Sequence, residues 1–266
     1  MIAAERQRRI LAVARSRGVV VLRDLVADLG VSEPTLRRDL SAMAEAGLLE
    51  RTRGGARLPI TLIHEPTYLE KVGEAGTEKE AIAAEAAGLI APGDSILLGA
   101  GTTTLALAHC LRDIEELTVV TNSLLVVNAL MAAPRIEVVV TGGILRRSIH
   151  ALVGPGTEQT LAALRLSSVF LSGNGLTASR GLSTPNPLVA ASDRALASAA
   201  ERVVVLADHT KIGHETMCGT VPCSQIDILV TDGDSPPDEL DRFRDVGIEV
   251  LVAGPMIESV RTPIID

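Results

Sequence analysis

Hydrophobic residues follow two different spacings along the chain, and the change occurs near residue 58. Before it, apolar residues recur every three or four positions, as they do on one face of a helix. After residue 76 they gather in short runs rich in Val, Ile and Leu that alternate with helical stretches. We therefore predict a small helical domain over residues 1–57, a linker over 58–76 and a larger α/β domain over 77–266.

The N-terminal pattern predicts a helix-turn-helix motif. Residues 22–29 carry their leucines on one side, and Gly30 can adopt the positive φ that often ends a helix. In the next helix, Leu36, Leu40 and Met43 recur at i, i+4 and i+7 and give that helix one buried stripe. A helix, a glycine turn and a second helix in this order are typical of DNA-binding proteins.

The exposed face of the second helix is the predicted DNA-recognition surface. A serine hydroxyl can cap the helix, a proline fits its first turn, and two adjacent arginines suit phosphates and guanine edges. Residues 19–21 and 48–57 predict a short strand and a hairpin wing, whose arginines suit backbone phosphates. A surface helix with solvated arginines would carry the same pair, so the prediction depends on the turn and the wing. The residues predicted to contact DNA are Ser32, Pro34, Thr35, Arg37, Arg38, Ser41, Arg51 and Arg53.

The second domain repeats one unit, a short apolar run that ends in small or polar residues. Strands are predicted at 95–99, 117–121, 136–141, 168–172, 203–207 and 226–231, and helices at about 77–90, 103–111, 124–132, 157–164, 187–200 and 237–245. Strands that alternate with helices form a parallel sheet covered on both faces, so we predict a Rossmann-like domain. Thr77 and Glu80 fit a capping box at the start of its first helix.

The polar ends of these strands predict one ligand site, because ligands of such sheets bind beyond the carboxyl ends of the strands. Residues 101–104 (Gly-Thr-Thr-Thr) lie between a strand and a helix and suit a phosphate, with Lys211 as a balancing charge. Asn122, Asn174 and Asp208 suit sugar hydroxyls. Each feature alone is more often a helix cap or a tight turn, so the prediction depends on their meeting at one edge.

Composition divides the chain in the same way. The chain carries a net charge of −8, but eleven arginines and seven acidic residues give residues 1–57 a charge of +4, which leaves −12 for the remainder. Only the first domain therefore has the electrostatic footprint for a DNA duplex. Aromatic residues make up 1% of the chain, which argues against single-strand binding by base stacking.

The cysteines and the N-terminus predict a cytoplasmic protein. Three cysteines without a secretory signal indicate free thiols in a reducing compartment, and no run is apolar and long enough to cross a membrane. His209, His214, Cys218 and Cys223 lie close in sequence, but their spacing does not match the common zinc patterns. We predict no metal site and no cofactor.

Three blocks of the first domain, ERQRRIL at 5–11, VSEPTLRRDL at 31–40 and ERTRGGA at 50–56, resemble the winged helix of the DeoR family of bacterial transcriptional regulators. The second domain resembles the family's sensor domain in seven blocks. These are KEAIAAEAAGLIAPGD from residue 79 and, after it, LGAGTTT, VVTNS, VVTGG, FLSGNG, ADHTK and LVTD. The resemblance covers nearly the whole chain. It implies a sheet similar to ribose-5-phosphate isomerase and an effector that is usually a phosphorylated sugar. The effector contacts that it implies are Gly101, Thr102, Thr103, Thr104, Asn122, Ser123, Gly142, Gly143, Gly173, Asn174, Gly175, Asp208 and Lys211.

Two segments leave the effector open. After Gly181 the family pattern has an acidic residue, but this chain has Leu-Ser-Thr-Pro-Asn-Pro at 182–187, and we expect this segment to face the variable end of the ligand. Arg146 and Arg147 follow a glycine pair and are expected either to contact a ligand phosphate or to be solvated.

These observations predict a repressor that binds double-stranded operator DNA and a phosphorylated sugar effector. A single winged helix with so few cations would bind weakly, so we expect a homo-oligomer, a dimer or a tetramer, and no membrane partner. The rival prediction is a sugar-phosphate isomerase with a DNA-binding head. Asp208 and Asp232 are the strand-end carboxylates that such an enzyme could use as a base.

Overall fold

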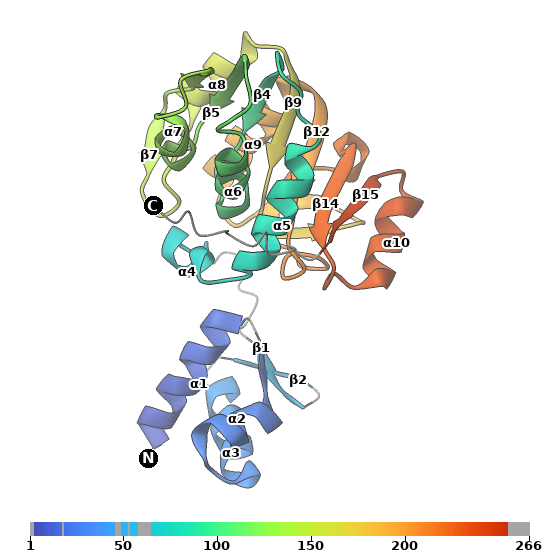
Figure 1. Ribbon diagram of the computed structural model, residues 1–266. Helices are drawn as coiled ribbons and strands as arrows, with labels where there is room; N and C mark the ends of the chain where they lie inside the picture. The colour runs from blue at the N-terminus through green and yellow to red at the C-terminus, as the bar shows by residue number, and fades with distance from the viewer. Residues whose placement is uncertain (1–2, 18, 46–48, 53, 58–64, 255–266) are drawn as a thin grey trace, which may run out of the picture. The chain divides into compact units, whose positions relative to one another are not determined.

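The computed structural model describes residues 3–17, 19–45, 49–52, 54–57 and 65–254. The chain divides into two compact units: residues 1–64 with 69–74, and residues 65–68 with 75–266. We call the first unit the head and the second the body, and each is described by itself (Figure 1).

The head is a winged helix-turn-helix, as predicted. Its strands pair antiparallel in the order β1-β3-β2, so the predicted hairpin wing and the short strand before the motif form one sheet. Gly30 ends the first motif helix with φ 63°, and its N–H donates to the carbonyl of Val26. The elements are α1 (Ala3–Arg17), β1 (Val19–Val21), α2 (Leu22–Leu29), α3 (Glu33–Glu45), β2 (Glu50–Thr52) and β3 (Gly55–Arg57).

The predicted apolar stripe of α3 forms the centre of the head's core. Leu36, Leu40 and Met43 are fully or almost fully buried, and they pack in one cluster with Ile10 of α1 and Leu25 of α2. The 3.6-residue period therefore placed this face correctly, because burial of one stripe is what holds a short helix against its neighbours.

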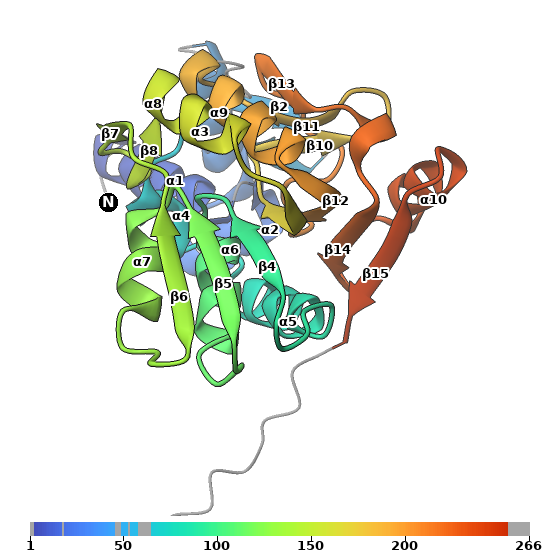
Figure 2. The same ribbon diagram turned by 90° about the horizontal axis from the view of Figure 1, so that it is seen from above.

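A seven-stranded parallel sheet runs through the body in the order β15-β14-β12-β9-β4-β5-β6 (Figure 2). The α/β prediction is therefore confirmed. The strands are β4 (Ser95–Leu98), β5 (Leu117–Thr121), β6 (Ile136–Val140), β9 (Leu166–Leu171), β12 (Ala200–Leu206), β14 (Ile228–Asp232) and β15 (Glu249–Ala253). The helices are α5 (Gly76–Ala87), α6 (Thr102–Cys110), α7 (Leu124–Leu130), α8 (Pro155–Ala162), α9 (Pro187–Ser198) and α10 (Pro237–Asp245), with a short 3₁₀ turn at Cys223–Gln225.

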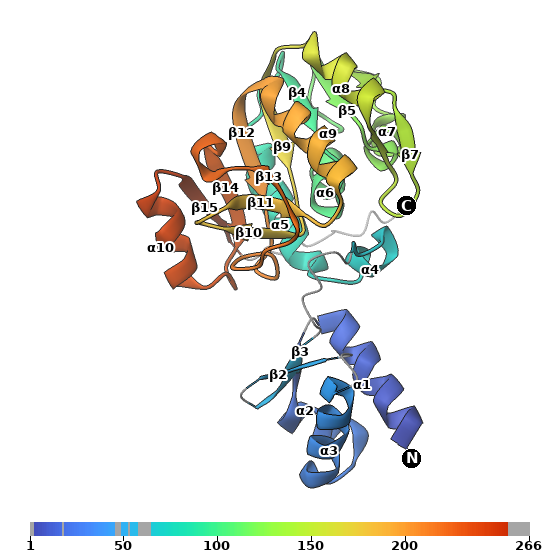
Figure 3. The same ribbon diagram turned by 180° about the vertical axis from the view of Figure 1, so that it is seen from behind.

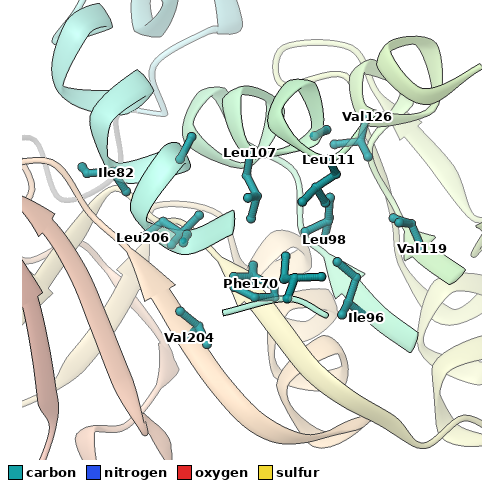
Figure 4. Packing of buried hydrophobic residues seen from close by; sticks show 14 of the residues in the cluster. Ile82, Ile96, Leu98, Leu107, Leu111, Val119, Val126, Phe170, Val204 and Leu206 are labelled. Carbon is teal, nitrogen blue, oxygen red and sulfur yellow. The ribbon is translucent and has the colours of Figure 1, made fainter. Parts of the chain in front are cut away.

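Helices cover both faces of this sheet. Successive side chains of a strand point to opposite faces, so side chains on both sides of the inner strands are buried. In β4, Ile96 and Leu98 belong to the cluster under α5, α6 and α7, whereas Leu97 belongs to the cluster under α8, α9 and α10. Figure 4 shows the first cluster, in which Leu107 of α6 and Phe170 of β9 lie close to Leu98. This arrangement explains why the strands appear in the sequence as continuous apolar runs.

Some strands were not predicted. β15 forms one edge of the main sheet, β7 (Ile144–Arg146) and β8 (Ala151–Val153) form a separate antiparallel hairpin, and β10 (Gly175–Thr177), β11 (Gly181–Thr184) and β13 (Cys218–Val221) form a small sheet (Figure 3). Apart from β15, each of these strands is at most four residues long, which is too short for a periodic pattern to identify.

The predicted capping box at the start of the first body helix is wrong. Helix α5 begins at Gly76, so Thr77 lies inside its first turn and cannot act as the cap. Ala75 occupies the N-cap position with a left-handed backbone (φ 47°) and no side-chain cap hydrogen bond. The predicted linker also contains a short helix, α4 (Tyr68–Val72).

Candidate functional site

The recognition helix α3 begins at Glu33, with Pro34 in its first turn as predicted. The carbonyl of Ser32 accepts hydrogen bonds from the N–H groups of Thr35 and Leu36 at 3.0 and 3.2 Å. The Ser32 hydroxyl pairs with the Thr35 hydroxyl at 2.9 Å and not with a backbone N–H. The predicted hydroxyl-to-amide cap is therefore replaced by a hydroxyl pair, which lies on the exposed side of the helix.

Arg37, Arg38 and Arg51 of the predicted recognition surface are exposed, and two of them have partners within the head. Arg37 donates from Nε and Nη2 to Oε1 of Glu33 at 2.9 and 2.6 Å. Arg51 of the wing donates to the carbonyl of Arg37 and to Oγ of Ser41, both at 3.1 Å. These contacts tie the wing to the recognition helix and orient both side chains. Arg38 is exposed, and Arg53 lies outside the described residues.

A buried ion pair behind this surface was not predicted. Asp39 of α3 is buried and accepts hydrogen bonds from the guanidinium of Arg6 in α1, with Nη2 to Oδ1 at 3.1 Å. The hydrogen bond to Asp39 raises the pKa of Arg6 above its ordinary value. The signal in the sequence was that Asp39 stands three positions after Leu36, on the apolar side of the helix.

In the body, the predicted effector residues follow neighbouring strands of the parallel sheet. Along the order β12, β9, β4, β5 and β6, the segments beyond the carboxyl ends are 208–211, 173–175, 101–104, 122–123 and 142–143. The structure therefore brings these segments to one edge of the sheet, since all five strands run in the same direction.

Residues 101–104 form the entry to helix α6. Thr103 and Thr104 are buried, and the Thr104 hydroxyl donates to the Gly101 carbonyl at 3.1 Å. A Cβ added to Gly101 would lie 2.1 Å from Oγ of Ser172, the residue after β9. Glycine at this position therefore lets the α6 entry approach the neighbouring strand end closely, and backbone N–H groups at such an entry suit an anion.

The segment after β5 contains a buried acceptor atom without a partner. Asn122 is 2% exposed, and its amide nitrogen donates to the Leu152 carbonyl at 3.0 Å, but its Oδ1 has no hydrogen-bond partner. Ser123 caps helix α7, because its hydroxyl accepts the N–H of Val126 at 3.3 Å. Of these two candidates, Asn122 retains hydrogen-bonding capacity for a ligand, and Ser123 has a structural role.

The segment after β6 depends on its two glycines. Gly142 and Gly143 have φ values of 71° and 117°, in the region that favours glycine. The Gly142 carbonyl accepts the hydroxyl of Thr157 at 2.7 Å, and this bond fixes the loop against α8. Arg146, which follows in β7, is half-buried and pairs with Glu65 at 2.7 Å, whereas Arg147 is exposed.

The segment after β9 is supported by the small sheet β10-β11-β13. Asn174 donates its N–H to the Ser183 carbonyl at 2.9 Å, and its Oδ1 accepts the Thr184 hydroxyl at 3.3 Å. A Cβ on Gly173 would lie 2.6 Å from a side-chain carbon of Leu182. A Cβ on Gly175 would lie 2.5 Å from the His214 carbonyl oxygen.

The segment at 182–187 was expected to face the variable end of the ligand. Leu182, Ser183 and Thr184 are buried strand residues of β11. Asn186 caps helix α9 by accepting the N–H groups of Leu188 and Val189, at 3.0 and 3.2 Å. These residues thus position the helix that follows.

Sequence reasoning missed Thr216, which lies beside this segment. It is 7% exposed, its N–H donates to the Ser183 hydroxyl at 3.0 Å, and its own hydroxyl has no partner. A lone threonine in a polar loop carried no signal that it would be buried.

The carboxylates that the isomerase prediction needs are engaged locally. Asp208 is buried and accepts hydrogen bonds from the N–H and hydroxyl of Thr210. Asp232 accepts the N–H of His209 at 2.7 Å, His209 Nδ1 at 3.1 Å and the N–H of Asp234 at 2.9 Å. The N–H of Lys211 donates to the Asp208 carbonyl. These contacts shape the loop after β12.

The four residues that a zinc site would need here, His209, His214, Cys218 and Cys223, are not the ones that the described part of the structure groups together. Within the described residues, the histidine and acidic side chains that approach one another closely enough to hold an ion are His209, Asp232 and Asp234. Cys223 instead donates its thiol to the carbonyls of Thr177 and Ala178, at 3.4 and 3.2 Å.

The comparisons with known proteins divide the chain as its two units do. Residues 6–61 match the DeoR-like helix-turn-helix domain, and residues 74–233 match the DeoR C-terminal sensor domain. The HTH-type transcriptional regulator GlpR of Haloferax volcanii is 34% identical over 94% of this chain and 98% of its own length. The regulator GolR of Listeria innocua is 32% identical, with coverage of 94% and 98%. The glycerol-3-phosphate regulon repressor of Escherichia coli K12 is 30% identical, with coverage of 92% and 97%.

Among solved structures, ribose 5-phosphate isomerase A of Methanocaldococcus jannaschii matches 50% of this chain and 52% of its own, with a TM-score of 0.38 and 18% identity. The β subunit of the translation factor eIF2B from Chaetomium thermophilum matches 58% of this chain and 48% of its own, with a TM-score of 0.40 and 15% identity. None of the helices in the described residues is long and apolar enough to span a membrane.

Proposed function

Because this chain belongs to the DeoR family of transcriptional regulators, we propose that it represses genes of sugar metabolism and that a phosphorylated sugar changes its operator affinity. The observation that carries the effector half of this proposal is the row of polar segments along one sheet edge, with the unpartnered Oδ1 of Asn122 buried among them. The relatives are named as repressors or regulators, and this supports repression over isomerase catalysis.

The head is proposed to bind double-stranded operator DNA through α3 and the wing. Arg37 and Arg38 are exposed on α3, and Arg51 bridges the wing to that helix. Arginine in this setting reads guanine edges and binds phosphates. A single winged helix of this charge would bind weakly, so we propose that two or four copies act together in the cytoplasm.

The body is proposed to bind the effector, and the effector's phosphate is proposed to lie at the α6 entry, residues 101–104. Asn122 and Asn174 would contact the hydroxyl groups, and the side chain of Lys211 would balance the phosphate charge. The name of one relative, a glycerol-3-phosphate regulon repressor, supports a small phosphorylated polyol or sugar as the ligand class. An effector acts only if it binds the DNA-competent and the released conformations unequally.

The test is fluorescence anisotropy of the protein on DNA from upstream of its own gene, first with increasing salt and then with a panel of sugar phosphates. We expect salt-sensitive binding that one compound releases. Specific binding that no phosphorylated sugar alters would contradict the effector half. Turnover of ribose 5-phosphate by the purified protein would favour the isomerase instead.

Roles within the head are tested by two arginine variants. Arg37→Ala is expected to weaken operator binding by about 1–3 kcal/mol and to relax base preference, because Arg37 lies on the recognition helix. Arg53→Ala in the wing is expected to weaken binding to all sequences alike. Equal, sequence-independent losses for both variants would contradict this division.

A further inference from the structure

Residues 65–68, which we call the anchored segment, are fixed to the body although they lie in the predicted linker. Glu65 has a side chain that is 8% exposed, and its Oε2 accepts hydrogen bonds from Arg146 Nε at 2.7 Å and Ser148 Oγ at 3.0 Å. The N–H of Tyr68 donates to the Ser148 carbonyl at 2.8 Å. The Tyr68 ring lies edge-on to the ring of His150, with centroids 5.2 Å apart.

These partners belong to one element, the β7–β8 hairpin with its turn at 147–150. The hairpin pairs within itself and is not part of the seven-stranded sheet. A charged carboxylate that is nearly excluded from water needs its cationic partner, because the unpaired charge would be strongly disfavoured. The anchored segment therefore depends on the position of Arg146 in β7.

The same hairpin is bonded along its other side to the segment after β5. The N–H of Leu152 donates to the Asn122 carbonyl at 2.7 Å, and the Asn122 amide nitrogen donates back to the Leu152 carbonyl. The N–H of Leu124 donates to the His150 carbonyl at 3.0 Å. At its base the hairpin begins directly after Gly143. Two of the proposed effector segments therefore adjoin the hairpin that holds the anchored segment.

We propose that the β7–β8 hairpin couples the effector site to the linker, with the Glu65–Arg146 pair as the coupling contact. This inference rests on the proposed function. It adds the path by which effector binding in the body reaches the linker and changes DNA binding. A ligand that bonds to Asn122 or to the Gly142–Gly143 loop biases the position of the hairpin. The hairpin in turn strengthens or weakens its hold on the anchored segment, whose flanking residues group with the head.

The first test measures amide hydrogen exchange in the full-length protein and in Glu65→Gln, which removes the charge and keeps the shape. We expect exchange roughly tenfold faster at the amide of Tyr68 and also at those of Leu124 and Leu152, on the far side of the hairpin. The buried amide of Val169 in the central sheet should keep its wild-type rate, and this checks that the variant is folded.

The matched control is Glu239→Gln, which removes the same charge from an ion pair with Arg242 on helix α10. It should leave the hairpin amides unchanged. Faster exchange at Tyr68 alone, or at none of the three amides, would overturn the coupling. Arg146→Gln should reproduce the effect, and the double variant Glu65→Gln/Arg146→Gln should add little, because both substitutions break one contact.

A second arm separates this inference from the proposed function. Glycerol 3-phosphate and ribose 5-phosphate are titrated against wild type and Glu65→Gln by calorimetry, and their effect on DNA binding is measured by anisotropy. If either compound binds, we expect Glu65→Gln to bind it and DNA but to lose most of the change in DNA affinity. An undiminished change would overturn the coupling. If neither compound binds wild type, neither is the effector, and the exchange rates alone decide the coupling.

Discussion

The head and the body carry their polar chemistry in opposite environments. On the head, the residues proposed to contact DNA lie on the exposed face of α3 and the wing, and the core beneath them is a separate apolar cluster. In the body, four of the proposed effector residues are buried in the segments that follow the strands: Thr103, Thr104, Asn122 and Asp208. Function and stability should therefore separate in the head and should be linked in the body, since a buried polar group needs its partners.

The largest expected effect tests whether the head has its own core. Leu36→Ala removes a fully buried side chain from the head's cluster and should cost about 2–5 kcal/mol of its stability. We expect DNA binding to be lost while the body's unfolding transition stays in place. The reciprocal variant, Leu98→Ala, should shift the body's transition only. Circular dichroism is the suitable probe, because the chain has no Trp. Equal shifts of both transitions in either variant would argue against two independent cores.

The next effect tests whether the proposed effector site is also a stability element. In Gly143→Ala, the new Cβ would lie 2.9 Å from the Val153 carbonyl oxygen and 2.3 Å from Thr157 Oγ1, at a φ of 117°. We expect a loss of about 2–4 kcal/mol in the body's unfolding free energy, together with a weaker effector response. The control is Gly142→Ala, where no atom lies within 4 Å and only the left-handed backbone is costly, about 1–2 kcal/mol. Equal losses would show that close packing at Gly143 is unimportant.

A smaller effect tests the separation of function and stability in the head. Arg38→Ala should weaken operator binding by about 1–3 kcal/mol and reduce its salt dependence. Its unfolding free energy should stay within about 0.5 kcal/mol of wild type, because the side chain is exposed. Arg244→Ala on α10 removes the same charge from the body and should leave DNA binding unchanged. A destabilised head in Arg38→Ala would break the comparison.

The smallest effect is expected in the body, which contains all three cysteines of the chain. Burial raises the pKa of the Cys223 thiol, and backbone hydrogen bonds partly oppose this. Above the ordinary thiol pKa the unfolded chain loses this proton first, so the thiol's contribution to stability is complete below that pH and falls as pH rises. Denaturant midpoints between about pH 8 and pH 10 should therefore decline less steeply in Cys223→Ala than in wild type. Identical slopes would contradict a buried, neutral thiol.

Local patterns were sufficient wherever one element's own residues decide its structure. The spacing of Leu36, Leu40 and Met43 predicted the buried face of α3, and Gly30 predicted the turn before it. The apolar runs predicted six strands of the main sheet because both of its faces are covered. The edge strand β15 was not predicted, although residues 250–253 (Val-Leu-Val-Ala) form an apolar run like those of the other strands.

The candidate site could be predicted only in part. The parallel order of the strands is enough to bring residues 101–104 and 122–123 to one edge, and both segments were identified from the sequence. The partners of each side chain were not identified. The N-cap role of Ser123, the unpartnered Oδ1 of Asn122 and the buried hydroxyl of Thr216 depend on atoms from other segments.

The sequence by itself predicted the recognition helix, the parallel sheet and the family, because periodicity and short motifs are local properties of a chain. Only the tertiary structure decided which charges far apart in the sequence are paired. Arg6 and Asp39 are 33 positions apart, and Glu65 and Arg146 are 81 positions apart. No local pattern links such residues. Their pairing follows from the packing of whole elements, which brings opposite charges together where water is excluded and an unpaired charge would be costly.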